Sequence, residues 1–401
     1  MKTIAFYLPQ FHAIKENNEW WGEGFTEWVN VKKAEPLFEG HYQPRVPLNQ
    51  NYYNLLDYEV MQWQVELAKK YGIYGFCFYH YWFDGHMLLE KPVEQFLAHT
   101  ELNLPFCICW ANEHWTKAWV NSEQKILIAQ RYGGPKEWEE HFNYLLPFFR
   151  DSRYICNNGK PLVVIYRAEI IECLNEMLDY WQELAKKNGF PGLEFAYQHI
   201  AFDLQKDRDD SRFTYDIEYQ PAYALNDMDN SGYKVLRDLK SKIVSKMDAI
   251  GLNLTEKHPD STRLRMFQKI WDAVRNIHPQ GLIKQSYDDV WQAALAHIPE
   301  SEKCLPGAFV GWDNTPRHKE RGRVFVDATP EKFQKYMTQQ IKRAKDIYHK
   351  DMLFLFAWNE WAEGGYMEPD EKFGYGYLEA LRNALEANGE MPDGYAGKKD
   401  E

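Results

Sequence analysis

Short apolar runs alternate with longer amphipathic stretches along the whole chain. Within each run the apolar residues are consecutive and do not alternate with polar ones, which is typical of parallel strands covered on both faces. We therefore expect strands with helices between them. The predicted strands lie at residues 3–8, 74–79, 105–110, 161–166, 193–198, 215–220, 307–312 and 352–358.

Several stretches between these runs carry the residues that commonly begin and end helices. Ser, Thr and Asp accept hydrogen bonds from the first free amides of a helix, whereas Gly tolerates the left-handed backbone that often ends one. The predicted N-caps are Asp57, Ser286 and Thr329, the last followed by Pro330, and the predicted C-terminal glycines are Gly72, Gly189 and Gly389.

Strands that alternate with helices over the whole chain predict an α/β fold, a single (β/α)8 TIM barrel. A doubly wound sheet is the alternative, but no Gly-rich phosphate loop follows the first strand, where residues 9–12 read PQFH. A long loop at 9–56 follows the first strand, and a helical insertion at 222–285 follows the sixth. We expect one catalytic barrel over residues 1–390 and a polar C-terminal tail at 391–401.

The insertion differs in charge from the rest of the chain. Residues 222–285 contain eleven Lys and Arg against seven Asp and Glu, whereas the whole chain carries a net charge of −12. A solvated helical excursion accounts for this composition, and so does a segment that covers the site or binds an anionic polymer. The acidic balance of the chain argues against nucleic acid as a partner.

The cysteines and the lengths of the apolar runs indicate in which compartment of the cell to expect the protein. The six cysteines show no zinc-like spacing, and three of them lie inside apolar strand-like runs. No apolar run approaches the length that spans a membrane, and the first one is too short for a signal peptide. We therefore expect a cytoplasmic protein with no membrane insertion and no cofactor, acting as a monomer or a small homo-oligomer.

Polar and aromatic residues gather directly after the predicted strands, at the end of a (β/α)8 barrel where active sites lie. Amides and carboxylates hydrogen-bond sugar hydroxyls, and flat rings stack on the C–H face of a sugar. We therefore expect a carbohydrate ligand at this end. The predicted substrate-binding residues are His80, Tyr81, Trp82, Trp110, Asn112, Glu113, Glu218, Trp312, Asp313, Arg317, Trp358, Asn359 and Trp361.

The sharpest signal is the pair Glu360 and Glu363, which follows the last predicted strand. Residues three apart in a turn have Cβ atoms about 5–6 Å apart, and carboxyl groups about 5–5.5 Å apart are typical of retaining glycosidases. Two acids from one loop approach a substrate from the same side. That placement suits a route in which one acid deprotonates a sugar hydroxyl that itself attacks the anomeric carbon.

The residues around this pair favour a catalytic role over a structural one. Desolvation by Trp358 and Trp361 raises the pKa of one carboxyl group and keeps it protonated as a general acid. The alternative is that Glu360 and Glu363 only form salt bridges or cap the last helix.

Two further patterns concern metals and nucleotides. His80 and His114 do not have the spacing of a standard zinc motif, so we predict no metal. Residues 207–209 and 227–229 match the Asp-x-Asp pattern with which some glycosyltransferases hold a metal and a nucleotide diphosphate. Neither lies where a nucleotide-binding strand would end, and such matches arise by chance in an acidic chain.

Five motifs, in order along residues 4–377, carry a family resemblance. They include FYLPQFHAIKENNEWWGEGFTEWVN near the start, YGFCFYHYWFDG, FCICWANEHWT, GWDNTPR and WNEWAEG. Together they resemble the bacterial WbsX-like family, often described as lipopolysaccharide-biosynthesis glycosyltransferases. The domain of that family is related to glycoside hydrolase family 99, which comprises endo-α-mannosidases and endo-α-mannanases.

The resemblance implies a (β/α)8 barrel that uses neither metal nor nucleotide. It also implies hydrolysis with retention through a 1,2-anhydro sugar, which the 2-hydroxyl of the substrate forms. Glu360 would match the base for that hydroxyl, Glu363 the general acid/base, and Glu218 an acid in the sugar site. Ala362 stands where family 99 enzymes commonly carry a histidine.

Our main hypothesis is a retaining glycoside hydrolase that acts on a polysaccharide or oligosaccharide. The alternative is a glycosyltransferase in the biosynthesis of a bacterial surface polysaccharide such as O-antigen. A non-catalytic glycan-binding module is a third reading, but it would not need both Glu360 and Glu363.

Overall fold

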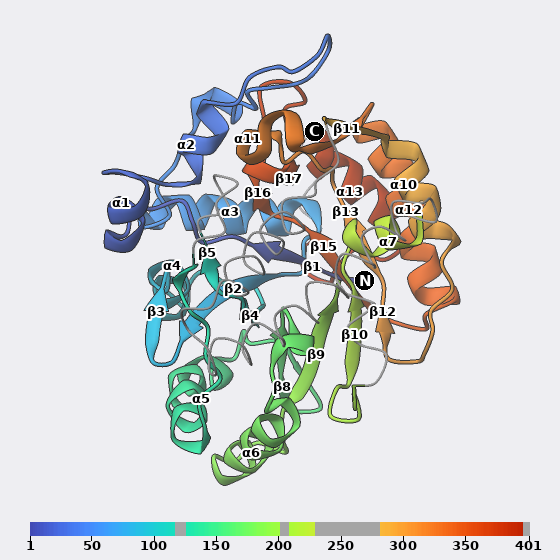
Figure 1. Cartoon of the computed structure of the whole chain (residues 1–401). Helices are drawn as coiled ribbons and strands as arrows, with labels where there is room; N and C mark the ends of the chain where they lie inside the picture. Colours follow the sequence, from blue (N-terminus) through green and yellow to red (C-terminus); the bar gives the residue numbers. More distant parts are fainter. Residues whose placement is uncertain (117–125, 201–207, 229–280, 396–401) are drawn as a thin grey trace, which may run out of the picture.

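The computed structural model describes residues 1–116, 126–200, 208–228 and 281–395. In this part of the chain, parallel strands form a nearly closed barrel with helices around it (Figure 1). The strands follow one another in the order β12-β10-β9-β8-β4-β2-β1-β15-β13. Their bounds are β1 (Lys2–Tyr7), β2 (Gly75–Phe83), β4 (Phe106–Trp110), β8 (Lys160–Ile165), β9 (Glu194–His199), β10 (Tyr215–Glu218), β12 (Cys304–Leu305), β13 (Gly307–Phe309) and β15 (Met352–Phe356).

The nine parallel strands occupy eight positions, because β12 and β13 are halves of one segment interrupted at Pro306. The first half pairs with β10, where Cys304 lies opposite Asp216. The second half pairs with β15, where Gly307 lies opposite Phe354. This single segment therefore joins the two ends of the sheet, which confirms the (β/α)8 fold and all eight predicted strands.

The outer helices occur where the sequence places them, and two of the three predicted N-caps bond through their side chains, whereas the side chain of Asp57 makes no capping bond to the helix that follows it. Ser286 accepts from the amide of Asp289, and Thr329 accepts from the amide of Lys332. The α-helices are α1 (Lys15–Trp21), α2 (Glu27–Lys32), α3 (Tyr58–Tyr71), α4 (Lys91–Ala98), α5 (Pro135–Phe149), α6 (Leu174–Lys187), α7 (Ala222–Met228), α10 (Tyr287–Ala296), α11 (Thr315–His318), α12 (Pro330–Asp346) and α13 (Gly376–Ala387).

Short elements decorate the loops of the barrel. The additional strands are β3 (His86–Leu88), β5 (Trp115–Thr116), β6 (Ile126–Ile128), β7 (Cys156–Asn157), β11 (Ile283–Ser286), β14 (Arg323–Val326), β16 (Asn359–Glu360) and β17 (Gly365–Tyr366). The 3₁₀ turns are η1 (Leu48–Gln50), η3 (Ala168–Ile170), η5 (Lys319–Arg321) and η6 (Trp361–Glu363).

The two predicted interruptions are described to different extents. The long first loop contains α1, α2 and η1, and α2 lies at the rim of the barrel (Figure 1). Most of the predicted insertion, residues 229–280, lies outside the described residues, as do residues 396–401 of the predicted tail. The first part of that tail is packed on the barrel, because the hydroxyl of Tyr395 donates to the carbonyl of Tyr74 at 3.0 Å.

Aromatic rings fill the interior of the barrel below its C-terminal mouth. The ring of Phe6 lies 5.6 Å from that of Tyr79 and 5.4 Å from that of Tyr219. Tyr219 in turn lies 5.8 Å from Phe356. Since these side chains come from three strands and from the residue that follows β10, they form a rigid aromatic floor under any site at this end.

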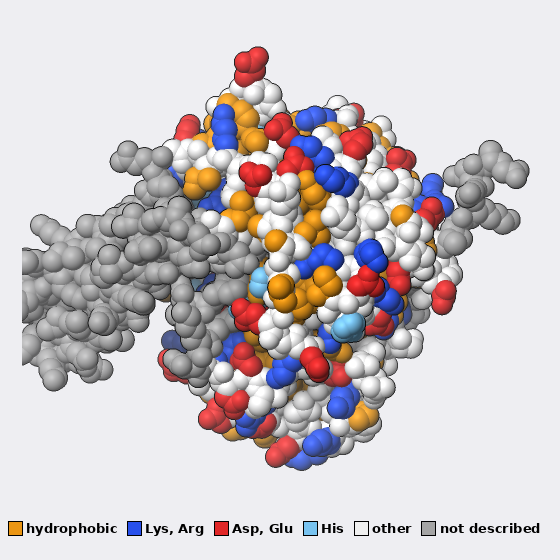
Figure 2. Space-filling view, turned by 90° about the vertical axis from the view of Figure 1, so that its right-hand side faces the viewer, with side chains coloured by type: hydrophobic (Ala, Val, Ile, Leu, Met, Phe, Trp, Pro, Cys, Tyr) orange, Lys and Arg blue, Asp and Glu red, His pale blue; other side chains and the backbone are white. Residues whose placement is uncertain are grey.

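One face of the molecule, shown in Figure 2, is mixed in charge. Over the face in Figure 2, Lys and Arg side chains are interspersed with Asp and Glu. Among the described helices, none is long and apolar enough to cross a membrane.

A buried glutamate fixes the segment that follows β15. The carboxylate of Glu368 accepts hydrogen bonds from the Tyr53 hydroxyl (2.7 Å), from the Gln64 amide (2.7 Å) and from the indole of Trp361 (2.6 Å). No Lys, Arg or His side chain within the described ranges pairs with it. Burial therefore raises the pKa of Glu368 to about 7. The long first loop, α3 and η6 are thus joined at one carboxyl group.

The close approach of two strands at Gly307 gives a first prediction. A Cβ atom at Gly307 would lie 1.9 Å from the carbonyl oxygen of Glu218. We expect Gly307→Ala to lower the free energy of unfolding by about 3 kcal/mol through overpacking. Gly134→Ala is the control, because a Cβ atom there meets nothing within 4 Å. Urea denaturation measures both, and equal midpoints for the two variants would contradict the strand pairing.

The burial of Glu368 gives a second prediction. Because its pKa is raised in the folded chain, the unfolded chain releases this proton at lower pH, and stability is lost as pH rises through about 7. Glu368→Gln removes this loss. We expect the stability of the variant relative to the wild type to increase by about 2 kcal/mol between pH 5 and pH 8. Parallel stability curves over this range, measured by urea denaturation, would refute the shift.

Candidate active site

A narrow pocket of about 60 Å³ lies at the C-terminal mouth of the barrel. It contains four of the residues predicted from the sequence, namely Tyr81, Glu113, Glu360 and Glu363. Its lining comes from the ends of six barrel strands, which is where this fold places its catalytic groups. The residues that line it are Leu8, Tyr79, Tyr81, Ala111, Glu113, His114, Trp115, Tyr166, Tyr219, Glu360 and Glu363.

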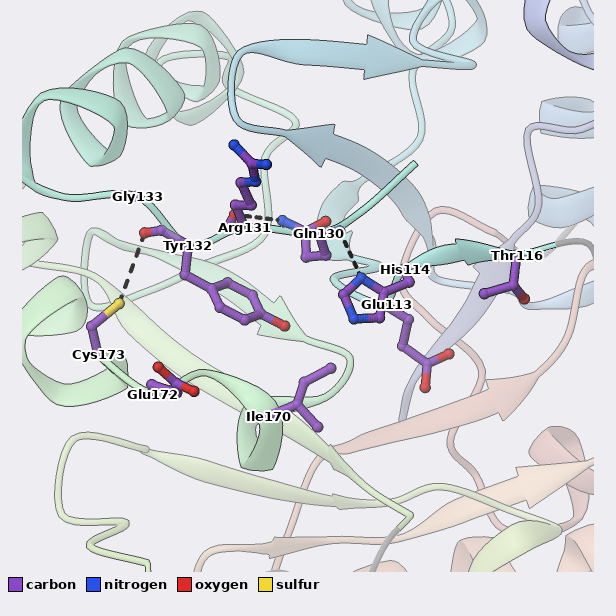
Figure 3. A pocket seen from close by; sticks show the side chains of 10 residues that line it. All are labelled: Glu113, His114, Thr116, Gln130, Arg131, Tyr132, Gly133, Ile170, Glu172 and Cys173. Carbon is purple, nitrogen blue, oxygen red and sulfur yellow. Dashed lines mark hydrogen bonds between the residues drawn. The ribbon is translucent and has the colours of Figure 1, made fainter. Parts of the chain in front are cut away.

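A second pocket of about 780 Å³ shares Glu113 and His114 with the first (Figure 3). Its walls come from the loops after β4 and β8 and carry many polar groups. The backbone amide of Gln130 donates to Nδ1 of His114 at 2.8 Å, and this bond fixes the histidine ring at the junction of the two pockets. The narrow pocket thus continues into a hollow large enough for several sugar rings.

The local backbone explains why Glu360 and Glu363 reach the same pocket. Trp361–Glu363 is a 3₁₀ turn, and Glu360 is the residue that precedes it. Side chains at positions i and i+3 of a 3₁₀ turn eclipse each other. Gly364 ends the turn in a left-handed conformation with φ of 65°. The spacing of three residues therefore becomes a common direction for the two carboxyl groups.

The guanidinium of Arg317 links these carboxyl groups to the first loop. It donates to Glu363 at 2.6 Å and lies 3.9 Å from Glu360. It also donates to Glu27 of α2 at 3.0 Å. Three carboxylates around one buried cation would leave a net charge of −2 if all were ionised, so the cluster favours retention of a proton.

The pKa directions agree with this charge count. Burial, followed by the charge of Glu363, raises the pKa of Glu360 well above its usual range. Burial also raises the pKa of Glu363, although Arg317 opposes the shift. Oε2 of Glu360 makes no hydrogen bond with the described parts of the chain. Both carboxyl groups are therefore harder to ionise than a free glutamate, and the ion pair with Arg317 offsets this most directly at Glu363, at 2.6 Å.

A third carboxyl group lies in the same pocket. Glu113 follows β4 and pairs with the guanidinium of Arg167. Asn112 holds that arginine in place, because its amide donates to the carbonyl of Arg167 and its oxygen accepts from the amide of Arg167, both at 2.8 Å. Burial raises the pKa of Glu113. Asn112 thus supports the wall of the pocket instead of lining it.

Three other predicted residues support the turn at Trp361–Glu363 from behind. Asp313 donates its backbone amide to the carbonyl of Glu363 at 2.6 Å. Asn359 bonds in both directions to the backbone of Leu8, at 2.7 and 3.0 Å. Trp361 stacks on Tyr366 with ring centroids 3.8 Å apart. These residues position Glu360 and Glu363 without lining their pocket.

The structure does not bring His80, Trp82 and Trp110 to the pocket. Nε2 of His80 lies 3.0 Å from Nε2 of His141 on α5, and Trp82 donates to Glu137 at 2.6 Å. The indole of Trp110 packs toward Trp181, with centroids 6.4 Å apart. Successive side chains of a strand point to opposite faces. When Tyr79 and Tyr81 point into the barrel, their neighbours must face the helices.

Glu218, Trp312 and Trp358 also lie outside the narrow pocket. Glu218 is completely buried and accepts from the hydroxyl of Tyr348 at 2.7 Å. Trp358 is buried with its ring 5.0 Å from Phe76. Trp312 packs against Phe356 at 5.4 Å, below the mouth. Glu218 is therefore a core residue and does not line the narrow pocket.

Some residues of the site were missed by the sequence analysis. Tyr79, Tyr166 and Tyr219 line the pocket, and the hydroxyls of Tyr79 and Tyr219 lie 3.2 Å apart. Strict alternation from Tyr81 back along β2 would have found Tyr79. Glu27 carries no such signal, because its position in the first turn of α2 is also what a simple helix N-terminus favours.

Metal and nucleotide sites receive no support from the described residues. Within them, no group of three or more His, Cys, Asp and Glu side chains could hold a metal ion. His80 and His114 belong to different environments, one between β2 and α5 and the other at the pocket. Both Asp-x-Asp patterns, at 207–209 and 227–229, extend beyond the described residues.

The fold agrees with what comparison to solved structures gives. The chain resembles the family 99 endo-α-mannosidase of Bacteroides thetaiotaomicron with a TM-score of 0.50, at 13% identity and 97% coverage of both chains. It also resembles a glycoside hydrolase-like protein with a TM-score of 0.54, at 12% identity, covering 96% of this chain and 93% of that one. At these identities the likeness concerns the fold.

Sequence comparison gives nearer relatives. The chain is 33% identical over 389 residues to the uncharacterised protein WxcX of Xanthomonas campestris pv. campestris, and equally so over 391 residues to WxcX of strain B100. These matches cover 95% of this chain but 49% of each relative, so the chain spans about half their length. The family model described as "Glycosyltransferase WbsX" matches residues 3–381, and the chain therefore belongs to the WbsX family.

Proposed function

We propose that this chain is a retaining glycoside hydrolase that cleaves a polysaccharide or oligosaccharide with participation of the substrate's 2-hydroxyl. The observation that supports it is the pair Glu360 and Glu363, which lines one pocket from one 3₁₀ turn. A direct nucleophile and a general acid flank the scissile bond from different sides. Two acids on the same side suit a reaction in which the substrate supplies the nucleophile.

In the first step, Glu360 takes the proton of the 2-hydroxyl and the 2-oxygen attacks the anomeric carbon. The bond to the leaving oxygen breaks as Glu363 gives that oxygen its proton, and a 1,2-anhydro sugar forms. In the second step, Glu363 takes a proton from water, and the water oxygen attacks the anomeric carbon. The strained bond to the 2-oxygen breaks, Glu360 returns its proton, and the configuration is retained.

Binding of substrate determines which of the two glutamates carries the proton. In the free chain the ion pair of 2.6 Å between Arg317 and Glu363 favours the proton on Glu360. A 2-hydroxyl that donates to the free Oε2 of Glu360 stabilises the ionised form of that residue. Because the two groups are coupled, the proton then moves to Glu363, where the first step needs it.

A glycosyltransferase is the second candidate, and the description of the matching family favours it. It would use the same pocket with a sugar acceptor in place of water. Stabilisation of the chain by a nucleoside diphosphate with Mn²⁺ would favour this candidate, because a ligand at 100 times its Kd adds about 2.7 kcal/mol.

The proposed reaction predicts release of new reducing ends without any nucleotide sugar. Suitable substrates are yeast α-mannan and the O-polysaccharide of Xanthomonas campestris, the organism of the WxcX relatives. We expect Glu363→Gln to lower the rate about 10²–10⁴-fold, since it removes the general acid. Glu386→Gln on α13, an exposed partner of Arg382, is the control and keeps the wild-type rate. A near-native rate for Glu363→Gln would contradict the assignment.

The division of roles predicts different responses to the leaving group. A 2,4-dinitrophenolate departs without protonation, so the first turnover of a dinitrophenyl glycoside does not need the general acid. We expect the first-turnover rate of Glu363→Gln on this substrate to stay within about tenfold of the wild type, while Glu360→Gln loses about 10²-fold or more. Stopped-flow release of the phenolate measures both. The opposite pattern would assign the acid role to Glu360.

A further inference from the structure

A second hollow, of about 490 Å³, lies on the other side of the turn at Trp361–Glu363. It shares no lining residue with the narrow pocket: Glu360 and Glu363 face that pocket, whereas Trp361 between them lines the hollow. Its other walls come from the loop 47–53, from α3 and from the start of α13. Among the described residues that line this hollow, none is Asp, Glu, Lys, Arg or His.

Three consecutive amide side chains edge the hollow. Asn49, Gln50 and Asn51 are exposed, and their side-chain amides make no hydrogen bond within the part of the chain that the structure describes. Their backbone is nevertheless held: the amide of Leu48 donates to the carbonyl of Pro369 at 3.0 Å, and that of Asn49 to Glu371 at 2.6 Å. Donors and acceptors are thus presented on a fixed support.

The backbone at this edge is also strained. Asn49 and Gln50 have φ values of 56° and 54°, in the left-handed region that residues with a Cβ atom rarely adopt. Each such residue costs on the order of 1–3 kcal/mol, and such costs collect where a surface has a function. Simple loop closure would be served better by glycine.

Two aromatic rings supply flat surfaces in the same hollow. Tyr375 is 37% exposed and stacks on Tyr71 at 18° between the ring planes, which fixes its orientation. Trp63 of α3 is half-buried against Tyr53, with centroids 6.3 Å apart. The ring of Tyr52 is covered on one side by Lys32 at 4.0 Å, so Trp63 and Tyr375 are the available platforms.

We infer that this hollow is a second carbohydrate site, which holds an uncharged segment of the glycan that the catalytic pocket acts on. Free amides match sugar hydroxyls, rings match the C–H face of a sugar, and a lining without charged side chains favours an uncharged ligand. The choice of a carbohydrate rests on the proposed function. Aromatic grooves also take proline-rich peptides, but three unpaired amides favour a polyhydroxylated ligand.

A second site on the same chain would serve the reaction on a polymer. The narrow pocket and the pocket of about 780 Å³ that continues it hold only the few sugar rings next to the scissile bond of a long polysaccharide. A polymer held at the hollow reaches the catalytic pocket at an effective concentration on the order of millimolar. The hollow is therefore expected to matter for polymers and not for small glycosides.

Binding to polysaccharide is measured with Trp63→Ala/Tyr375→Ala by affinity electrophoresis in gels containing yeast α-mannan or O-polysaccharide of Xanthomonas campestris. All proteins carry Glu363→Gln so that the glycan is not cleaved. We expect the Kd to rise about tenfold, which corresponds to about 1.4 kcal/mol. Trp63→Phe/Tyr375→Phe keeps the rings and should restore most of the affinity. Tyr180→Ala on α6, across the barrel from α3, controls for loss of a surface ring (Figure 1).

Substitutions of the amide side chains at the edge of the hollow provide an independent test that leaves the aromatic rings in place. Gln50→Ala/Asn51→Ala should weaken binding in the same gels with an unchanged melting temperature. The inference is overturned if neither polysaccharide retards the chain, if the alanine variants bind as tightly as Tyr180→Ala, or if decaproline binds at the hollow in place of glycan. Loss of binding in these variants, together with no release of reducing ends by the wild-type chain, would uphold the site and refute the hydrolase.

Discussion

The charge balance around Arg317 is the constraint on which the site depends. One buried guanidinium, that of Arg317, faces the carboxyl groups of Glu27, Glu360 and Glu363. Its single positive charge cannot neutralise three carboxylates. Leaving a buried charge unpaired costs several kcal/mol, and protonation of one carboxyl group avoids that cost. The same cation joins the first, seventh and eighth strand–helix loops. The geometry of the pocket and its proton content therefore have one origin.

The overall architecture follows from sequence patterns that do not depend on distant contacts. Continuous apolar runs located every barrel strand except the two-residue β12, and Ser286 and Thr329 cap helices as expected from their types. The short strand before Pro306 was not anticipated, because the predicted strand at 307–312 begins after that proline. A proline has no amide for the ladder, so the segment pairs with one neighbour before it and with the other after it.

The sequence predicted where in the fold the candidate site lies, but not which side chains line it. Reading every polar residue after a strand ignored the alternation of side chains, which sends Tyr81 into the barrel and His80 toward α5. Alternation is a local rule and would have corrected these assignments. The contact of Glu27 with Arg317 spans 290 positions and depends on how the first loop folds, so no local pattern could have revealed it.

The 3₁₀ form of the turn Trp361–Glu363 explains how one short motif lines pockets on two sides of the protein. In an α-helix, residues three apart differ by about 60° in direction, whereas in a 3₁₀ turn they coincide. Glu360 and Glu363 therefore point together into the pocket, and Trp361 points away from it. The indole donates at 2.6 Å to the buried Glu368, which also accepts from Tyr53 of the first loop, and these bonds fix the turn. Ala362 is completely buried within the turn, so a histidine at this position would require the packing around it to change.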